Sequence, residues 1–133
     1  MCAMTTANYT RKNLASVEDS APKFGFEDRQ EARFANDDLN AEKTGLSYHT
    51  VKAGKRQAFA HRHDAAEEIY VILAGTGRLK LDDDIIEVGE LDAIRIAPGV
   101  TRQFEAGPEQ LQYLAVGPHH RGDGELFKDW WTA

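Results

Sequence analysis

From residue 45 onward, glycines separate short segments of the chain. The segments between them are rich in β-branched and aromatic residues, which favour strands. Many short strands separated by turn residues are typical of a β-sandwich or a β-barrel. The sequence therefore predicts an all-β domain with strands at 46–51, 57–61, 68–73, 77–81, 85–88, 93–96, 102–105 and 111–116.

Two turns are predicted within this series. Asp82, Asp83 and Asp84 lie between two apolar segments, and Asp favours tight turns because its side chain bonds the nearby backbone. Pro98 fixes φ and Gly99 accepts a positive φ, a pair that favours a type II turn. The chain is therefore expected to reverse direction at both places.

The length and charge limit the classes of function. A chain of 133 residues, 41% of them apolar, is enough for one domain with a core. The net charge of -6 disfavours binding to nucleic acid. The first 25 residues lack the apolar core of a secretion signal, and no apolar segment approaches the roughly 20 residues of a membrane span. The lone cysteine, Cys2, excludes an intramolecular disulfide, and we expect a cytoplasmic protein without a membrane partner.

The ends of the chain follow a different pattern from the middle. Residues 1–45 are predicted to form a partly irregular N-terminal arm, in which 31–35 is either a short strand or a helical turn. Residues 46–117 form the predicted barrel. Residues 118–133 are predicted to be a tail that packs on the barrel through Trp130 and Trp131.

Two histidines and a glutamate stand at a spacing that can converge. On a strand, residues two apart project to one face, so His61 and His63 point the same way. A short turn follows, and Glu68 begins the next strand. Burying a carboxylate without a cation costs several kcal/mol, which a divalent metal would offset. The alternative is that all three are surface residues of two polar strand ends.

The spacing of Gly54, His61, His63, Glu68 and Gly75 resembles the first signature motif of the cupin superfamily. The interval between Gly54 and His61 is one residue longer than in the common form, a difference that a loop can absorb. The resemblance implies a metal site on the two histidines and the glutamate. The same ligands suit Fe, Zn, Ni, Mn or Co, so the identity of the metal stays open.

Residues 89–107 resemble the second cupin motif, with Pro98 and Gly99 at its turn. The family usually has a histidine ligand three residues after this glycine, but Arg102 stands there. A guanidinium is always protonated and has no lone pair to donate, so it cannot replace that ligand. We expect Arg102 to orient an anionic ligand near the metal, with an outward orientation toward solvent as the alternative.

The resemblance implies a double-stranded β-helix, or jelly-roll, barrel. It leaves two functions open: a metal-dependent oxygenase or isomerase acting on a small metabolite, or a noncatalytic cupin that binds a small molecule such as an anion or a sugar. A homodimer is expected, because Ile69, Val71 and Leu73 face away from the lumen and need a cover. That cover is either the N-terminal arm or a second copy of the chain.

Further residues are assigned by strand parity. Gln57 shares the parity of His61 and His63, and Tyr70 shares that of Glu68, so both are candidate substrate-binding residues. By the same reasoning His49 faces away from the lumen and is left out of the site. His119 and His120 are adjacent and are expected to be solvated loop residues.

Overall fold

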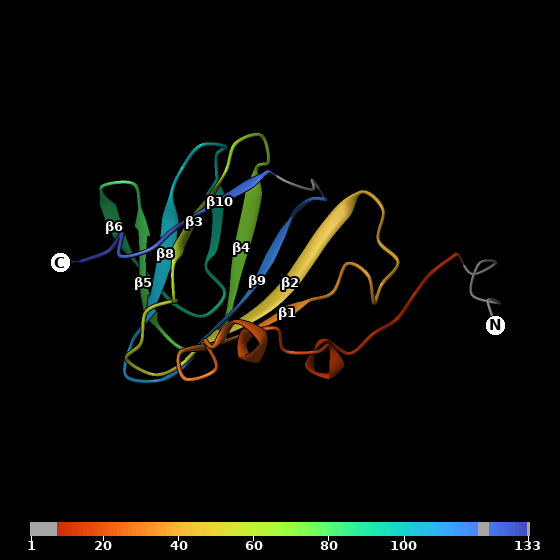
Figure 1. Ribbon diagram of the computed structural model, residues 1–133, viewed down its shortest axis with the longest axis horizontal. Helices are drawn as coiled ribbons and strands as arrows, with labels where there is room; N and C mark the ends of the chain where they lie inside the picture. Colours follow the sequence, from red (N-terminus) through yellow and green to blue (C-terminus); the bar gives the residue numbers. More distant parts are fainter. Residues whose placement is uncertain (1–7, 120–122, 133) are drawn as a thin grey trace.

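Two antiparallel sheets of five strands each face one another in the computed structural model of the protein (Figure 1). The structure describes residues 8–119 and 123–132; Cys2 and His120 lie outside them. One sheet has the strand order β1-β2-β9-β4-β7 and the other the order β10-β3-β8-β5-β6. The arrangement is a jelly-roll barrel, as predicted. The strands are β1 (Gln30–Phe34), β2 (Thr44–Val51), β3 (Ala60–His63), β4 (Glu68–Ala74), β5 (Gly77–Leu81), β6 (Asp84–Val88), β7 (Ala93–Ile96), β8 (Arg102–Ala106), β9 (Leu111–Pro118) and β10 (Gly124–Phe127).

The two predicted turns are confirmed. Strands β5 and β6 form a hairpin in which Leu81 pairs with Asp84, and Asp82 at the turn has a positive φ of 52°. Gly99 has a φ of 85° and follows Pro98 in the turn before β8, where the N–H of Val100 donates to the carbonyl of Ala97. A positive φ is costly for residues with a Cβ, so this turn requires its glycine.

Burial alternates along β4 as a two-residue period demands. Tyr70 and Ile72 are buried in the barrel core, whereas Ile69 and Leu73 on the other face remain 41% and 37% exposed. The core continues from Tyr70 to Phe104 and Tyr113, whose rings lie 4.3 to 5.2 Å apart. Aromatic rings at these separations pack favourably and bury large apolar areas. These rings form the packed core next to the polar residues of the candidate site described below.

The predicted strand at 57–61 is wrong in its bounds, because the observed strand is β3 (Ala60–His63). Arg56 makes an isolated bridge to Glu105, and regular pairing starts only at Ala60. Gln57 therefore lies outside the strand that carries His61, and strand parity does not relate their two side chains. Two observed strands were not among the eight predicted. One is β1, which shows that the segment at 31–35 is a strand and not a helical turn, and the other is β10 near the C-terminus.

The N-terminal arm runs along one end of the barrel (Figure 1). It contains two short 3-10 helices, η2 (Leu14–Ser16) and η3 (Ala21–Phe24), and then pairs as β1 with β2. Its Phe26 contacts Phe59 edge to face at 5.3 Å. The arm therefore covers the segment before β3, while Ile69 and Leu73 stay exposed.

At the other terminus, Trp131 is buried and the guanidinium of Arg56 lies 4.4 Å from its ring centroid. Trp130 receives the ammonium of Lys80 at 3.9 Å. Such cation–π contacts hold the final residues against β5 and the bridge before β3. None of the helices in the described part of the chain is long and apolar enough to cross a membrane.

Candidate metal centre

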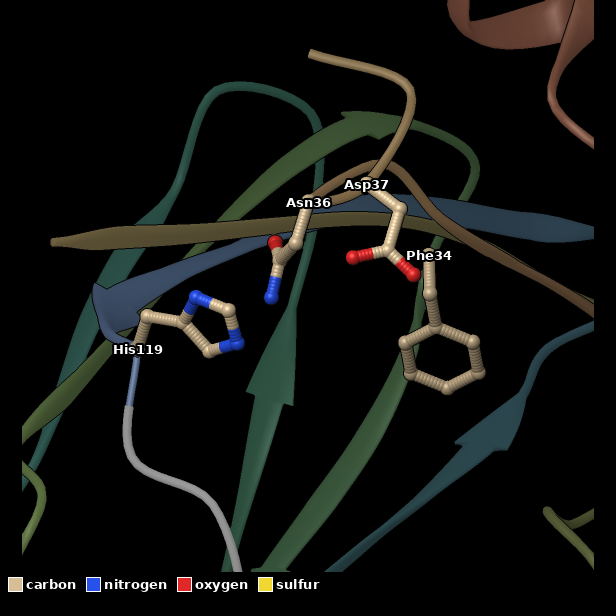
Figure 2. Close-up of a pocket in the computed structure, with 4 residues that line it drawn as sticks. All are labelled: Phe34, Asn36, Asp37 and His119. Carbon is tan, nitrogen blue, oxygen red and sulfur yellow. The ribbon is translucent and has the colours of Figure 1, made fainter. Parts of the chain in front are cut away.

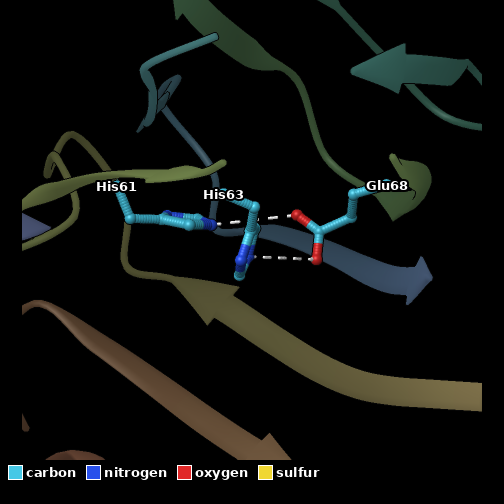
Figure 3. Close-up of side chains that lie close together, drawn as sticks. All are labelled: His61, His63 and Glu68. Carbon is cyan, nitrogen blue, oxygen red and sulfur yellow. Dashed lines mark ion pairs between the residues drawn. The ribbon is translucent and has the colours of Figure 1, made fainter. Parts of the chain in front are cut away.

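Strands β3 and β4 bring His61, His63 and Glu68 together at one end of the lumen (Figure 3). Nε2 of His61 lies 3.8 Å from Oε1 of Glu68, and Nε2 of His63 lies 3.8 Å from Oε2. One ligand atom from each residue lies within 4.8 Å of the others. The two imidazole rings stand at 82° to each other, so their nitrogens approach the carboxylate from different directions.

Arg102 points into this group and is only 1% exposed. It pairs directly with His61 across β3 and β8, which places both side chains on the same face of their sheet. Its Nη2 donates to Oε1 of Glu68 at 2.6 Å, its Nε to the hydroxyl of Tyr70 at 3.0 Å, and its Nη1 to the carbonyl of Val100 at 3.0 Å. The outward alternative for Arg102 is therefore absent from this structure.

The charges around Glu68 fix it as a carboxylate. Burial alone would raise its pKa, but the close approach of His61 and the positive charge of Arg102 outweigh burial and lower the pKa to about 2. The pKa of His63 is lowered, chiefly because burial disfavours the imidazolium. An ionised carboxylate and a neutral imidazole are the forms that bind a metal.

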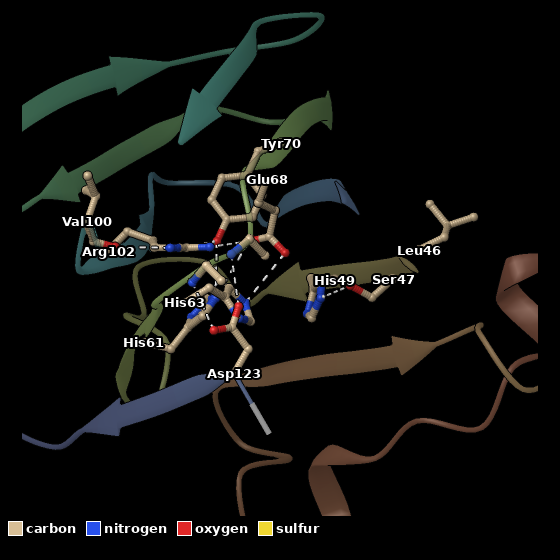
Figure 4. Close-up of polar contacts among 12 residues, drawn as sticks. Leu46, Ser47, His49, His61, His63, Glu68, Tyr70, Val100, Arg102 and Asp123 are labelled. Atoms are coloured by element: carbon tan, nitrogen blue, oxygen red, sulfur yellow. Dashed lines mark hydrogen bonds and ion pairs between the residues drawn. The ribbon is translucent and has the colours of Figure 1, made fainter. Parts of the chain in front are cut away.

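Tyr70 joins the group through its hydroxyl, which lies 3.4 Å from Nε2 of His61 as well as 3.0 Å from Nε of Arg102 (Figure 4). Burial and the nearby charge of Glu68 raise its pKa, so the phenol remains protonated. Of the candidate substrate-binding residues, Tyr70 and Arg102 thus lie beside the three ligands.

Gln57 is buried but its amide is committed to other partners. Its Nε2 donates to the hydroxyl of Tyr113 at 2.7 Å, and its Oε1 accepts from the backbone N–H of Phe104 at 2.9 Å. These bonds fix the segment before β3 to the aromatic core. A contact between Gln57 and a substrate remains a prediction.

His49 points inward, contrary to the expectation that it lies off the site. It pairs with Tyr113 on β9 and stacks on that ring at 4.9 Å and 12°. Its Nε2 lies 2.8 Å from the Ser47 hydroxyl, and its Nδ1 is buried without a partner in the described part of the chain. Burial and then the charge of His61 lower its pKa to about 4. His49 shares its parity with Val51, which is in the core, but only the pairing of β2 with β9 shows that this face of the strand is the inner one.

Asp123 was also missed, since it lies beyond the predicted barrel. It immediately precedes β10, which pairs with β3, and its Oδ2 is 3.8 Å from Nδ1 of His63. Burial raises the pKa of Asp123, but backbone N–H groups of Ala65, Ala66 and Asp64 lower it overall. No sequence spacing connects position 123 to the histidines; only the sheet pairing does.

A separate hollow of about 160 Å³ is lined by Phe34, Asn36, Asp37 and His119 (Figure 2). It shares no residue with the three candidate ligands. The backbone N–H of His119 bonds to the carbonyl of Lys43, so this histidine belongs to the end of β9 and the start of β2. The hollow is therefore distinct from the candidate metal centre.

The residues present fit a single divalent metal ion. Metal–nitrogen bonds are about 2.0–2.1 Å long, so ligand atoms around one ion lie about 3 Å apart. The observed separations are 3.8 Å for the two nitrogen–oxygen pairs and up to 4.8 Å within the group, so they need shifts of about 1–2 Å. Arg102 occupies Oε1 of Glu68, while Oε2 faces His63. The donor set is two imidazoles and one carboxylate, a set that suits several transition metals and leaves coordination positions open.

Comparison with known proteins agrees with this geometry. The model of the cupin domain family matches residues 47–117, and the chain therefore belongs to the cupin family. The match contains all three candidate ligands and Arg102. It does not include β1, β10 or Asp123.

Individual relatives support the same assignment. The chain is 33% identical over 89 residues to the uncharacterized protein MJ1618 of Methanocaldococcus jannaschii, which is 65% of this chain and 70% of that protein. It resembles the crystal structure of a cupin protein from Bacteroides fragilis, with 26% identity, a TM-score of 0.71, and coverage of 88% and 89% of the two chains. The polyketide cyclase RemF from Streptomyces resistomycificus shares the fold at 22% identity and a TM-score of 0.72, with coverage of 91% and 85%.

Proposed function

We propose that this cupin binds one divalent transition metal on His61, His63 and Glu68 and acts on a small metabolite as a metal-dependent oxygenase or isomerase. The observation that carries the proposal is the convergence of the three ligand atoms within 4.8 Å at the end of an enclosed aromatic core. When bound, such a metal supplies Lewis-acid chemistry and open positions for a substrate. Fe, Zn, Ni, Mn and Co all suit the ligands.

The charges favour an anionic substrate. Glu68 and Arg102 neutralise each other, so a divalent cation at the three ligands leaves the group with a net positive charge. Three of the five N–H donors of Arg102 are bonded to described residues, and the side chain is only 1% exposed, so an anion would meet the remaining two donors only inside the lumen. A guanidinium forms two parallel bonds to a carboxylate, which would orient that ligand beside the metal.

The test is the metal content of the protein purified without a histidine tag. We expect about one transition metal ion per chain. His61→Ala and His63→Ala should each abolish occupancy, while the matched control His119→Ala should keep it, because His119 lies outside the group. Equal metal content in the His61 and His63 variants and the parent would place the site elsewhere.

A noncatalytic cupin that binds a small anion or sugar is the second candidate. The buried 2.6 Å ion pair between Arg102 and Glu68 favours it, because this pair already neutralises the carboxylate that a metal would otherwise balance. A parent protein that takes up none of the five metals, but binds small carboxylates in a manner that depends on Arg102, would establish this function instead.

We also propose that a second copy of the chain covers the outer face of β4. Ile69 and Leu73 are exposed there, and the described part of the N-terminal arm packs against Phe59 and β2 instead. Burial of such a face stabilises a symmetric dimer. Light scattering should give about twice the mass of one chain, and a mass of 14.8 kDa at all concentrations would disprove the dimer.

A further inference from the structure

The turn that joins the two ligand strands is held by a carboxylate from the far end of the chain. Oδ1 of Asp123 accepts the backbone N–H groups of Asp64 at 3.0 Å and Ala65 at 2.9 Å, and Oδ2 accepts that of Ala66 at 3.0 Å. Asp123 thus caps the residues directly between His63 and Glu68. It lies outside the segment that matches the cupin family model.

The same carboxylate has one acceptor position left. A carboxylate offers about four lone-pair positions, and the three N–H groups occupy two on Oδ1 and one on Oδ2. The group across from Oδ2 is Nδ1 of His63, at 3.8 Å. That Nδ1 is buried and has no hydrogen-bond partner in the described part of the chain. A buried polar nitrogen without a partner is costly, so a bond to Asp123 would satisfy both groups.

The backbone leaves the approach open. Gly124 pairs with His63 across β10 and β3, and a Cβ at Gly124 would lie 3.7 Å from Nδ1. The absence of a side chain there keeps the edge of the ring that carries Nδ1 open toward Asp123. Figure 4 shows the Asp123 side chain projecting from just before β10 toward the two histidines.

We propose that Asp123 is a positioning residue that accepts a hydrogen bond from Nδ1–H of His63 and so presents the Nε2 lone pair to the metal. A neutral imidazole carries one N–H, so a proton held at Nδ1 leaves Nε2 free to bind. Nε2 lies 3.8 Å from Oε2 of Glu68, on the side of the ring where the proposed metal would lie. Carboxylates that hold metal-binding histidines in this way raise the affinity for the metal. The inference rests on the proposed metal binding only for its functional consequence.

A purely structural role for Asp123 would be confined to the turn. In that case its loss would lower the stability of the apo protein without changing the proton position on His63. Positioning predicts instead a change in the tautomer of His63 and in metal affinity. The two roles are therefore separable by measurement.

The first measurement is Zn²⁺ titration of the full chain by calorimetry. Asp123→Asn places a donor where Oδ2 was and should weaken Zn²⁺ binding about 10- to 100-fold. Asp123→Glu, which keeps a carboxylate, should recover part of the loss. The matched control is Glu125→Gln, the same change from an acid to an amide at a position two residues further along, on β10. The Glu125 side chain pairs with Arg62, away from the histidines. The Zn²⁺ affinity of this variant should equal that of the parent.

The second measurement is ¹⁵N NMR of the His63 ring in the metal-free protein, assigned with a His63→Gln variant. The parent and Glu125→Gln should show the Nδ1–H tautomer, and Asp123→Asn should shift the ring toward Nε2–H. Unchanged tautomer and Zn²⁺ affinity in Asp123→Asn would overturn the role of Asp123 and leave the metal site standing. A parent that binds no Zn²⁺, Fe²⁺, Mn²⁺, Co²⁺ or Ni²⁺, but whose tautomer depends on Asp123, would overturn the proposed function and support the positioning.

Discussion

Glu67 and Glu68 are consecutive residues, and each pairs with an arginine in a different environment. Glu68 bonds Arg102 at 2.6 Å inside the barrel, with side-chain exposures of 17% and 1%. Glu67 bonds Arg95 at 3.1 Å on the surface, with exposures of 55% and 63%. The same two residue types therefore form a buried and an exposed ion pair one position apart.

The two ion pairs differ in what solvates one charge when its partner is removed. Water solvates a charge on the surface, so an exposed pair contributes little to stability. Inside the lumen, removal of one partner leaves the other charged and poorly solvated, which is strongly unfavourable. In the proposed metal site, a cation bound by His61 and His63 would replace Arg102 as the partner of Glu68, because both histidines stand beside that carboxylate.

The largest effect is expected from Arg102→Ala in the metal-free protein. It should lower the free energy of unfolding by about 3–5 kcal/mol, because Glu68 loses its cation and the core loses the packed arginine stem. Chemical denaturation in the presence of a chelator measures the change. Added Zn²⁺ should restore part of the loss, since it supplies a cation at Glu68. A loss no greater than about 1 kcal/mol would show that the inner pair behaves as an exposed one.

A smaller effect is expected from acid, through His49. Its pKa of about 4 lies below the usual value near 6.5, so the unfolded chain binds a proton first as the pH falls. The contribution of neutral His49 to the free energy of unfolding is therefore fully present above about pH 6.5. It is lost as the pH falls toward 4, by up to about 3 kcal/mol. The titratable groups near His49 are His61, Glu68 and Tyr113, and its ring also contacts Phe34 and the hydroxyl of Ser47.

Unfolding measured by denaturant between pH 4 and 7 in metal-free protein tests the effect of His49. The variant His49→Phe cannot take up a proton, so its stability should vary less over this range. Equal slopes in the parent and in His49→Phe would mean that His49 does not cause the acid sensitivity.

The sequence predicts some parts of the fold and of the candidate site better than others. The three candidate ligands are close in sequence, and strand parity with one short turn is enough to bring them together. The turns at Asp82 and Gly99 follow from local backbone preferences, and both are confirmed. Local rules therefore account for these two turns and for the candidate ligand group.

Residues whose position depends on pairing between distant strands could not be found in this way. His49 faces inward because β2 pairs with β9, and Asp123 reaches His63 because β10 pairs with β3. The strand at 57–61 was misplaced because the isolated bridge at Arg56 interrupts the pairing, which parity alone does not reveal. Each error concerns register between segments far apart in the sequence.

Arg102→His tests the inner pair through its effect on metal binding. Position 102 pairs with His61 and lies on the lumen face, so a histidine there would offer a fourth ligand and would remove a positive charge from the group. We expect Zn²⁺ binding to be about tenfold tighter than in the parent, a difference of about 1.4 kcal/mol. Competition titration with a chelator measures it. Unchanged affinity would mean that position 102 does not reach the metal.

The smallest effect is expected from Arg95→Ala, the counterpart of Arg102→Ala in the outer pair. Arg95 and Glu67 are both more than half exposed, so water replaces each partner when the other is removed, and the free energy of unfolding should change by less than about 1 kcal/mol. Because the pair contributes through exposed charges, added salt should reduce even this change. Denaturation of both arginine variants in low and high salt gives the comparison directly. If Arg95→Ala costs as much as Arg102→Ala, the outer face of β4 is not solvated in the protein as it exists in solution. Such a result would indicate that Arg95 and Glu67 are covered there, as burial of this face against a second copy of the chain would require.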